Sequence, residues 1–275
     1  ANFLKKKKNK IFVIDDLSNG SKKRLNKNIF FKKLCISNEK EIKKIILENN
    51  ISTIIHLAGK INATESQKKK REYLKINYSY SKILYQTAIS LNVKKFIFAS
   101  TAAVYGDYKR LFKETDVTKP INNYGLSKLK FEEYLNYEKK IDHVILRFFN
   151  VTGNYYVKGK NINKNDSVIL KLFKTYKKKK NRFYISSNKK KESTRRDFIH
   201  IFDLIKIIEK TINNKNKFLN LNCGYGKSMS IFEILIEFEK KYKYEFIKVF
   251  KIKKKTDPFE VIADTSRLKK LFNFS

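Results

Sequence analysis

Tyr124 and Lys128 are the side chains whose types and spacing best fit acid–base chemistry. Residues four apart lie on one face of a helix, and a lysine ammonium near a phenol lowers the phenol pKa from about 10 toward neutrality. The same spacing recurs at Tyr78, Tyr105, Tyr156, Tyr176 and Tyr244, so spacing alone decides little. Context distinguishes Tyr124, because it opens a predicted helix and follows a strand that ends in Ser100 and Thr101.

Short apolar, β-branched runs alternate with longer amphipathic stretches along the chain, which predicts an α/β protein with a doubly wound parallel sheet. We expect strands at 11–14, 53–58, 96–100, 144–148, 183–185 and 218–221. We expect helices at 37–50, 73–91, 127–137, 167–176, 201–212 and 231–241. Such sheets bind ligands at the carboxyl ends of their strands. The polar or small residues expected there are Asp15, Asp16, Gly59, Ser100, Thr101 and Asn150.

The stretch 154–165 is rich in Gly, Asn and Lys and is the best candidate for a domain boundary. The sequence therefore predicts a nucleotide-binding domain over 1–153 and a mainly substrate-binding subdomain over 154–275. We expect residues 197–222 to return to the first domain.

The chain is strongly basic: 63 Lys and Arg against 26 Asp and Glu give a net charge of +37 over 275 residues. Only eight of the basic residues are Arg, whereas Lys, Asn and Ile, which share AT-rich codons, are abundant. Nucleic-acid recognition relies heavily on Arg, so we interpret the charge as solvated surface and expect no specific nucleic-acid partner. Nonspecific polyanion binding at low salt is expected as a side effect.

Cys35 and Cys223 are the two cysteines, too few for a disulfide scaffold or a Cys-rich zinc site. The three histidines show no metal-ligand spacing, so no metal is predicted. No uncharged apolar run approaches the ~18 residues of a membrane span, and no signal peptide is evident. We expect a cytoplasmic protein that does not enter a membrane.

Asp15 follows a strand, where a dinucleotide-binding fold places a carboxylate for the adenosine ribose. A turn Asp is an equally good interpretation. The glycine-rich turn that accompanies such an acid is not in the sequence, because none of the eight glycines forms the G-x-G-x-x-G or G-x-x-G-x-x-G pattern.

Several motifs occur together in one order along nearly the whole chain. They are VIDDLSNG (13–20), IIHLAG (54–59), TES (64–66), FIFASTAAVYG (96–106), NNYGLSK (122–128), ILRFFNVTG (145–153), RRDFIHIFDL (195–204), NLNCGYGKSMS (220–230) and VIADTSRLKKLFNF (261–274). The chain thus resembles the extended short-chain dehydrogenase/reductase family and, within it, the UDP-glucose 4-epimerases. The resemblance implies a Rossmann-like domain with a smaller α/β substrate-binding subdomain, NAD as cofactor, a UDP-sugar substrate and a homodimer through helices 73–91 and 127–137.

The resemblance also implies roles for individual residues. Tyr124 would be the catalytic acid/base, Lys128 would hold the nicotinamide ribose, and Thr101 would bridge the sugar 4-hydroxyl and Tyr124. The implied cofactor residues are Asp15, Asp16, Ile36, Ala58, Gly59, Asn77, Ser100, Tyr124 and Lys128. The implied substrate residues are Thr101, Asn150, Arg196, Lys254 and Asp257. The structural alternatives are a strand-end hydroxyl for Thr101, a turn residue for Asn150 and an exposed side chain for Arg196.

The activity implied is epimerisation at C4 of UDP-glucose or UDP-galactose through a 4-keto intermediate. Related dehydratases carry acidic residues after the strand-end hydroxyls, but Ala102 and Ala103 stand there in this chain, and alanine cannot transfer protons. Other nucleotide-sugar epimerases or reductases, and a truncated, catalytically impaired remnant, stay open as alternatives.

Some positions depart from the family pattern. The first strand and its glycine loop are expected before Ala1, so the chain is either a fragment or a natural truncation. Cys35 stands where an Asp usually contacts the adenine, and Lys254 replaces a second phosphate-binding Arg. The stretch 186–194 is Lys-rich, and the chain stops soon after 271–274.

Overall fold

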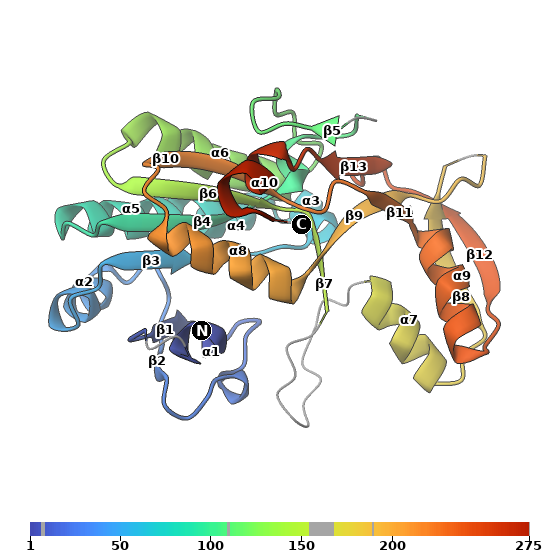
Figure 1. Ribbon diagram of the computed structural model, residues 1–275, viewed down its shortest axis with the longest axis horizontal. Helices are drawn as coiled ribbons and strands as arrows, with labels where there is room; N and C mark the ends of the chain where they lie inside the picture. The colour runs from blue at the N-terminus through green and yellow to red at the C-terminus, as the bar shows by residue number, and fades with distance from the viewer. Residues whose placement is uncertain (7–8, 109–110, 154–167, 189, 275) are drawn as a thin grey trace.

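A computed structural model of the protein describes residues 1–6, 9–108, 111–153, 168–188 and 190–274 (Figure 1). Its centre is a parallel sheet in the order β10-β6-β4-β3. The strands are β3 (Thr53–His56), β4 (Lys95–Thr101), β6 (Asp142–Phe148) and β10 (Phe218–Cys223). The expected boundary at 154–165 lies outside the described residues, and the division into two domains stays a prediction.

Helices cover both faces of this sheet because its strands are apolar on both sides. Phe96 and Phe98 of β4 pack in a cluster with α2 (Glu39–Glu48), α5 (Tyr80–Ser90) and α6 (Asn123–Glu138). Ile97, between them, points to the opposite face, where it packs with α8 (Ile201–Asn213) and α10 (Ser266–Phe272). Figure 1 shows α8 on the other side of the sheet from α5 and α6.

The N-terminal strands form a sheet of their own. β1 (Phe12–Asp15) and β2 (Phe30–Lys33) pair in parallel, and α1 (Asn2–Lys6) lies beside them in Figure 1. The pair is not hydrogen-bonded to the four-stranded sheet, so the expected strand at 11–14 forms but does not extend the central sheet.

A second sheet lies beyond the carboxyl ends of the central strands. Its path is β11-β9-β13-β5, with β7 also paired to β9. The members are β5 (Leu111–Phe112), β7 (Asn150–Thr152), β9 (Arg195–His200), β11 (Ser228–Ser230) and β13 (Glu260–Ala263). A parallel pair, β8 (Arg182–Ser187) and β12 (Ile247–Ile252), packs with α7 (Val168–Lys177) and α9 (Ile231–Tyr242) around a core of its own.

The expected helix 73–91 is longer and less regular than its pattern suggested. It comprises α4 (Lys70–Leu74), a π-helical segment η2 (Lys75–Ser79) and α5, and the short α3 (Ala63–Lys68) precedes it. Two short 3-10 segments, η1 (Lys22–Arg24) and η3 (Ala102–Val104), complete the elements. In the described part of the chain, no helix has both the length and the apolar composition needed to cross a bilayer.

Candidate active site

The start of α6 is fixed against the end of β4. Asn122 caps the helix, since its side-chain oxygen accepts a hydrogen bond from the Gly125 amide at 2.8 Å. Its amide group donates to the Thr256 carbonyl at 3.1 Å, which ties the cap to the C-terminal part of the chain. A Cβ on Gly125 would lie 2.4 Å from the Ala103 carbonyl oxygen, so the glycine permits the close approach of α6 to η3. This contact sets Tyr124 beside the last residue of β4.

Tyr124 and Thr101 are brought together as expected, since the Thr101 hydroxyl lies close enough to the Tyr124 phenol to influence its pKa. Thr101 ends β4, and its hydroxyl oxygen also accepts from the Ala103 amide at 3.2 Å. Burial raises the pKa of the Tyr124 phenol, and the Thr101 hydroxyl opposes that effect. Lys128 does not contribute to this shift, because its ammonium is held elsewhere. The expected lowering by the ammonium together with a cationic nicotinamide stays a prediction.

Lys128 is a buried lysine, one helical turn after Tyr124. Its ammonium donates to the Ala99 carbonyl at 3.0 Å and lies 4.8 Å from the centre of the Phe98 ring. Burial lowers the pKa of Lys128 to about 8, and the charge of Glu132 acts in the opposite direction. The Lys128 ammonium therefore loses its proton near pH 8 rather than near the pH of 10.5 usual for lysine.

Gly59 and Asn77 lie next to the Lys128 ammonium. Gly59 has a φ of +150°, and a Cβ there would meet the Asn77 side-chain oxygen at 2.7 Å and Lys128 Nζ at 3.2 Å. Asn77 sits in the π-helical segment, a feature frequent at functional sites. Its side chain accepts from the Lys60 amide and donates to the Lys60 carbonyl and to Ser127 Oγ, at 2.8, 2.9 and 2.9 Å. The absence of a Cβ at Gly59 thus lets the backbone pack directly against Asn77 and the Lys128 ammonium.

The two acids after β1 hold their own turn. Asp15 accepts a hydrogen bond from the Leu17 amide at 2.7 Å, and the more exposed Asp16 accepts one from the Ser18 amide at 2.8 Å. A Cβ on Gly20 would lie 2.6 Å from the second carboxylate oxygen of Asp15. Asp15 can therefore be a turn residue or a ribose-binding residue. The turn uses one of its carboxylate oxygens, and the other lies next to Gly20.

The other implied cofactor residues lie in different settings. Ala58 is half-buried and immediately precedes Gly59. Ile36 packs against the core cluster on the α5 face of the sheet. The Ser100 hydroxyl donates to the buried carboxylate of Glu132, so this side chain contributes to an internal network.

On the substrate side, Arg196 and Asp257 meet. Arg196 Nη2 bonds Asp257 Oδ1 at 2.6 Å, while Nη1 donates to the carbonyls of Arg195 and Phe259 at 2.7 and 3.0 Å. The guanidinium is therefore held in one orientation. Asn150 lies in β7, opposite Phe198 of β9 in the strand register.

Lys254 is exposed, and its carbonyl accepts from the Asp257 amide at 3.0 Å. The ammonium of the preceding lysine, Lys253, donates to the Asp107 carboxylate and to the Asp257 carbonyl, each at 2.9 Å. Sequence reasoning missed Lys253 and Asp107, because the two are joined across 146 residues.

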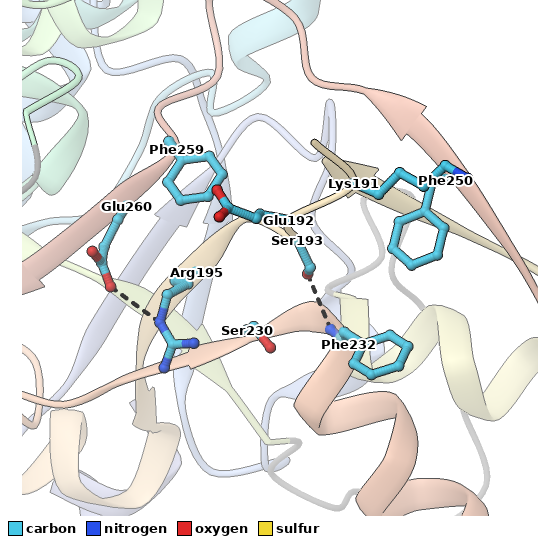
Figure 2. A pocket seen from close by; sticks show the side chains of 9 residues that line it. All are labelled: Lys191, Glu192, Ser193, Arg195, Ser230, Phe232, Phe250, Phe259 and Glu260. Carbon is cyan, nitrogen blue, oxygen red and sulfur yellow. Dashed lines mark hydrogen bonds and ion pairs between the residues drawn. The ribbon is translucent and has the colours of Figure 1, made fainter. Parts of the chain in front are cut away.

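A hollow of about 570 Å³ opens on the second sheet (Figure 2). Its lining includes Arg195, which bonds Glu260 at 3.1 Å, and the aromatic rings of Phe232, Phe250 and Phe259. None of the predicted site residues lines it. Neighbouring residues of a strand point to opposite faces, so the side chains of Arg195 and Arg196 lie on opposite faces of β9.

Within the described ranges, no group of three or more His, Cys, Asp or Glu side chains is arranged to hold a metal ion. Burial raises the pKa of the Cys223 thiol, and Cys35 lies 3.2 Å from the Ser37 hydroxyl.

The parallel sheet covered on both faces, with a Tyr–Lys helix beside the carboxyl end of β4, defines a Rossmann-like protein of the short-chain dehydrogenase/reductase type. The predicted fold class is confirmed. The chain belongs to the NAD dependent epimerase/dehydratase family, which it matches over residues 1–224.

Named relatives agree with this assignment. The chain is 29% identical to UDP-glucose 4-epimerase of Mycoplasma genitalium, over 100% of this chain and 86% of the relative. It is 29% identical to ADP-L-glycero-D-manno-heptose-6-epimerase of Brachyspira hyodysenteriae, over 85% of this chain and 73% of the relative. The crystal structure of UDP-glucose 4-epimerase from Thermotoga maritima, with UDP-glucose, superposes with a TM-score of 0.88 at 24% identity and covers 99% of this chain and 87% of that one. The expected resemblance and the epimerase type of enzyme are confirmed.

Proposed function

We propose that the protein interconverts UDP-glucose and UDP-galactose by NAD-dependent epimerisation at C4. The observation that carries this proposal is the position of Tyr124 at the start of α6, next to Thr101 at the end of β4 and one helical turn before the buried Lys128. The sequence of the UDP-glucose 4-epimerase relative aligns with the whole chain, which also supports it.

The nicotinamide half of NAD would bind beside Lys128, where the absence of a Cβ at Gly59 brings the backbone close to Asn77 and the ammonium. Lys128 and Asn77 would hold that ribose, and Asp15 would accept from the adenosine ribose. For the diphosphate, the 275 residues contain no glycine-rich turn. When bound, NAD would supply the hydride acceptor and donor and the positive charge of its oxidised nicotinamide ring.

The chain's own residues supply positioning and proton transfer. Thr101 would accept a hydrogen bond from the sugar 4-hydroxyl and donate its own hydroxyl proton to Tyr124, so that a proton can pass from the sugar to the phenolate. The Tyr124 phenolate would take the hydroxyl proton as C4 is oxidised and return it after the ketone has turned over in the site. Ala102 and Ala103 offer no acid at the end of β4, which favours epimerisation over dehydration.

Conversion of UDP-galactose to UDP-glucose by the purified protein, after addition of NAD, tests this proposal. The heptose-epimerase relative makes an ADP-heptose the second candidate substrate, with inversion at C6. Turnover of the ADP-heptose together with no turnover of UDP-galactose would favour the second candidate.

Arg196 would bind the substrate diphosphate with its guanidinium fork. Replacing it by Ala is expected to raise KM for the UDP-sugar roughly 10- to 100-fold, since a hydrogen bond to a charged group is worth ~1.5–3 kcal/mol. Arg196→Lys should give a smaller increase, because a lysine keeps the charge but not the fork. Steady-state kinetics measure both variants.

Arg195→Ala is the matched control for the Arg196 variants. Arg195 is the neighbouring arginine, but it faces the hollow of Figure 2. The KM of the Arg195→Ala variant for the UDP-sugar should equal that of the wild type. An unchanged KM in a folded Arg196→Ala protein would remove Arg196 from the substrate site.

The homodimer is also proposed, through α5 and α6 as the resemblance implies. These helices lie together on one face of the sheet, and Tyr137 near the end of α6 is 85% exposed. Light scattering should give twice the 32.7 kDa chain mass, and Tyr137→Glu should shift it toward the monomer. A monomeric wild-type protein at micromolar concentration would contradict the proposal.

A further inference from the structure

Glu132 lies on the same face of α6 as the proposed catalytic residues. Tyr124, Lys128 and Glu132 follow one another at spacings of four, so they form one row along the helix. Glu132 is only 1% exposed. A carboxylate so deeply buried requires charged and hydrogen-bonding partners.

Those partners come from two strands of the central sheet. Arg147 of β6 bonds the Glu132 carboxylate at 2.6, 3.1 and 3.2 Å, using Nη2 once and Nε twice. The Ser100 hydroxyl of β4 donates to the same carboxylate. Ser100 and Arg147 are register partners in the sheet. Glu132 therefore joins α6 to β4 and β6. Its contact on β4 is Ser100, the residue before Thr101.

Arg147 is itself held on its far side. Its Nη1 donates to the Tyr105 hydroxyl at 2.9 Å and to the Glu114 carbonyl at 3.1 Å. Tyr105 in turn donates to Asn222 of β10 at 2.6 Å. Arg147, Tyr105 and Asn222 are all buried, so the ion pair sits in a network that leaves it little freedom to move.

The surroundings of the Lys128 ammonium make Glu132 electrostatically important. From β3, His56 faces it, but burial lowers the pKa of that ring to about 3 and keeps it neutral. From β4 it meets the Ala99 carbonyl and the Phe98 ring. From its own helix, Glu132 contributes a negative charge that favours the ammonium form.

We propose that Glu132, fixed by Arg147 and Ser100, is a positioning residue that holds α6 against β4 and keeps the Lys128 side chain charged. The role of Lys128 in catalysis rests on the proposed function, but the electrostatic coupling of Glu132 to Lys128 does not. Glu132 itself is buried, and its carboxylate is bonded to Arg147 and Ser100.

The test is a titration of Lys128 by ¹³C and ¹⁵N NMR in lysine-labelled protein. The resonance is assigned by its absence in Lys128→Met. Glu132→Gln should shift the Lys128 pKa downward by about one pH unit, because it removes an anion and leaves the Arg147 cation nearby. Arg147→Gln should shift it upward, because it leaves the anion without its partner. A purely structural role predicts no such opposite pair of shifts.

Two further variants complete the test. Glu133→Gln makes the same chemical change at the adjacent, exposed position and should leave the Lys128 pKa unchanged. Glu132→Gln/Arg147→Gln removes both buried charges and leaves no unpaired charge in the interior. It is therefore informative even if one of the single variants does not fold. It should lower the Lys128 pKa by less than Glu132→Gln does. A wild-type Lys128 pKa in folded Glu132→Gln or in the double variant would overturn the proposal.

Kinetics separate this inference from the proposed function. If the protein epimerises UDP-galactose, the alkaline limb of kcat in Glu132→Gln should move down by the same shift, with KM for the sugar unchanged. If it does not, the NMR titration still decides the coupling between Glu132 and Lys128.

Discussion

Tyr124→Phe is expected to reduce kcat for UDP-galactose by about 10²- to 10⁴-fold, the usual contribution of a positioned acid–base group. The substitution removes only the phenol oxygen and keeps the ring. Binding of NAD and of the UDP-sugar should change little, because the phenol oxygen contributes mainly in the transition state. Stopped assays with a coupled readout of UDP-glucose measure kcat, and calorimetry measures binding.

Tyr176→Phe is the matched control for this prediction. Tyr176 also has a lysine four residues later, but it lies in α7 among Phe238, Tyr242 and Tyr244. The kcat of the Tyr176→Phe variant should equal that of the wild type. A fully active Tyr124→Phe protein would show that the acid–base group is a different residue.

Arg147→Met is expected to lower the free energy of unfolding by about 3–5 kcal/mol, the usual effect of removing one partner of a buried ion pair. The variant leaves the Glu132 carboxylate buried without its cation and takes one donor from Tyr105. Urea denaturation measures the change.

Two variants complete this stability prediction. Arg147→Met/Glu132→Leu should recover most of the loss, because it leaves no lone buried charge. Arg267→Met, at an exposed arginine, should change the free energy of unfolding by less than about 0.5 kcal/mol. A loss below about 1 kcal/mol in Arg147→Met would mean that the pair does not hold the sheet and α6 together.

The sequence predicted the strands of the central sheet well, because their apolar runs are long enough to stand out. It predicted the shorter strands poorly. β2 has two lysines among its four residues, and β5 and β7 have two and three residues. Such segments form because neighbouring strands hold them, which a local pattern does not reveal.

The start of α6 illustrates a signal that was present but unused. The periodic pattern predicted a helix over 127–137 with Tyr124 at its opening, whereas the observed helix begins at Asn123 after an Asn122 cap. Asn is among the preferred N-cap residues, so the cap could have been read from the sequence. The Gly125 in the first turn obscured it, because glycine disfavours helix.

Ser100 shows what a linear sequence cannot supply. Ser100 and Thr101 were both assigned to the site, but their side chains have different partners. The Thr101 hydroxyl influences the Tyr124 phenol, and the Ser100 hydroxyl donates to Glu132. A Glu and an Arg within apolar stretches do signal a buried pair, although nothing local says that residues 132 and 147 are partners.

The most direct measurement follows a deuterium atom at C4. The purified protein is given NAD and UDP-galactose labelled with deuterium at C4, and the products are analysed by NMR. Oxidation and reduction at C4 within one closed site predict UDP-glucose that keeps the label at C4. Exchange of the label for solvent hydrogen, or UDP-galactose left unconverted by protein that binds both NAD and the sugar nucleotide, would contradict the account.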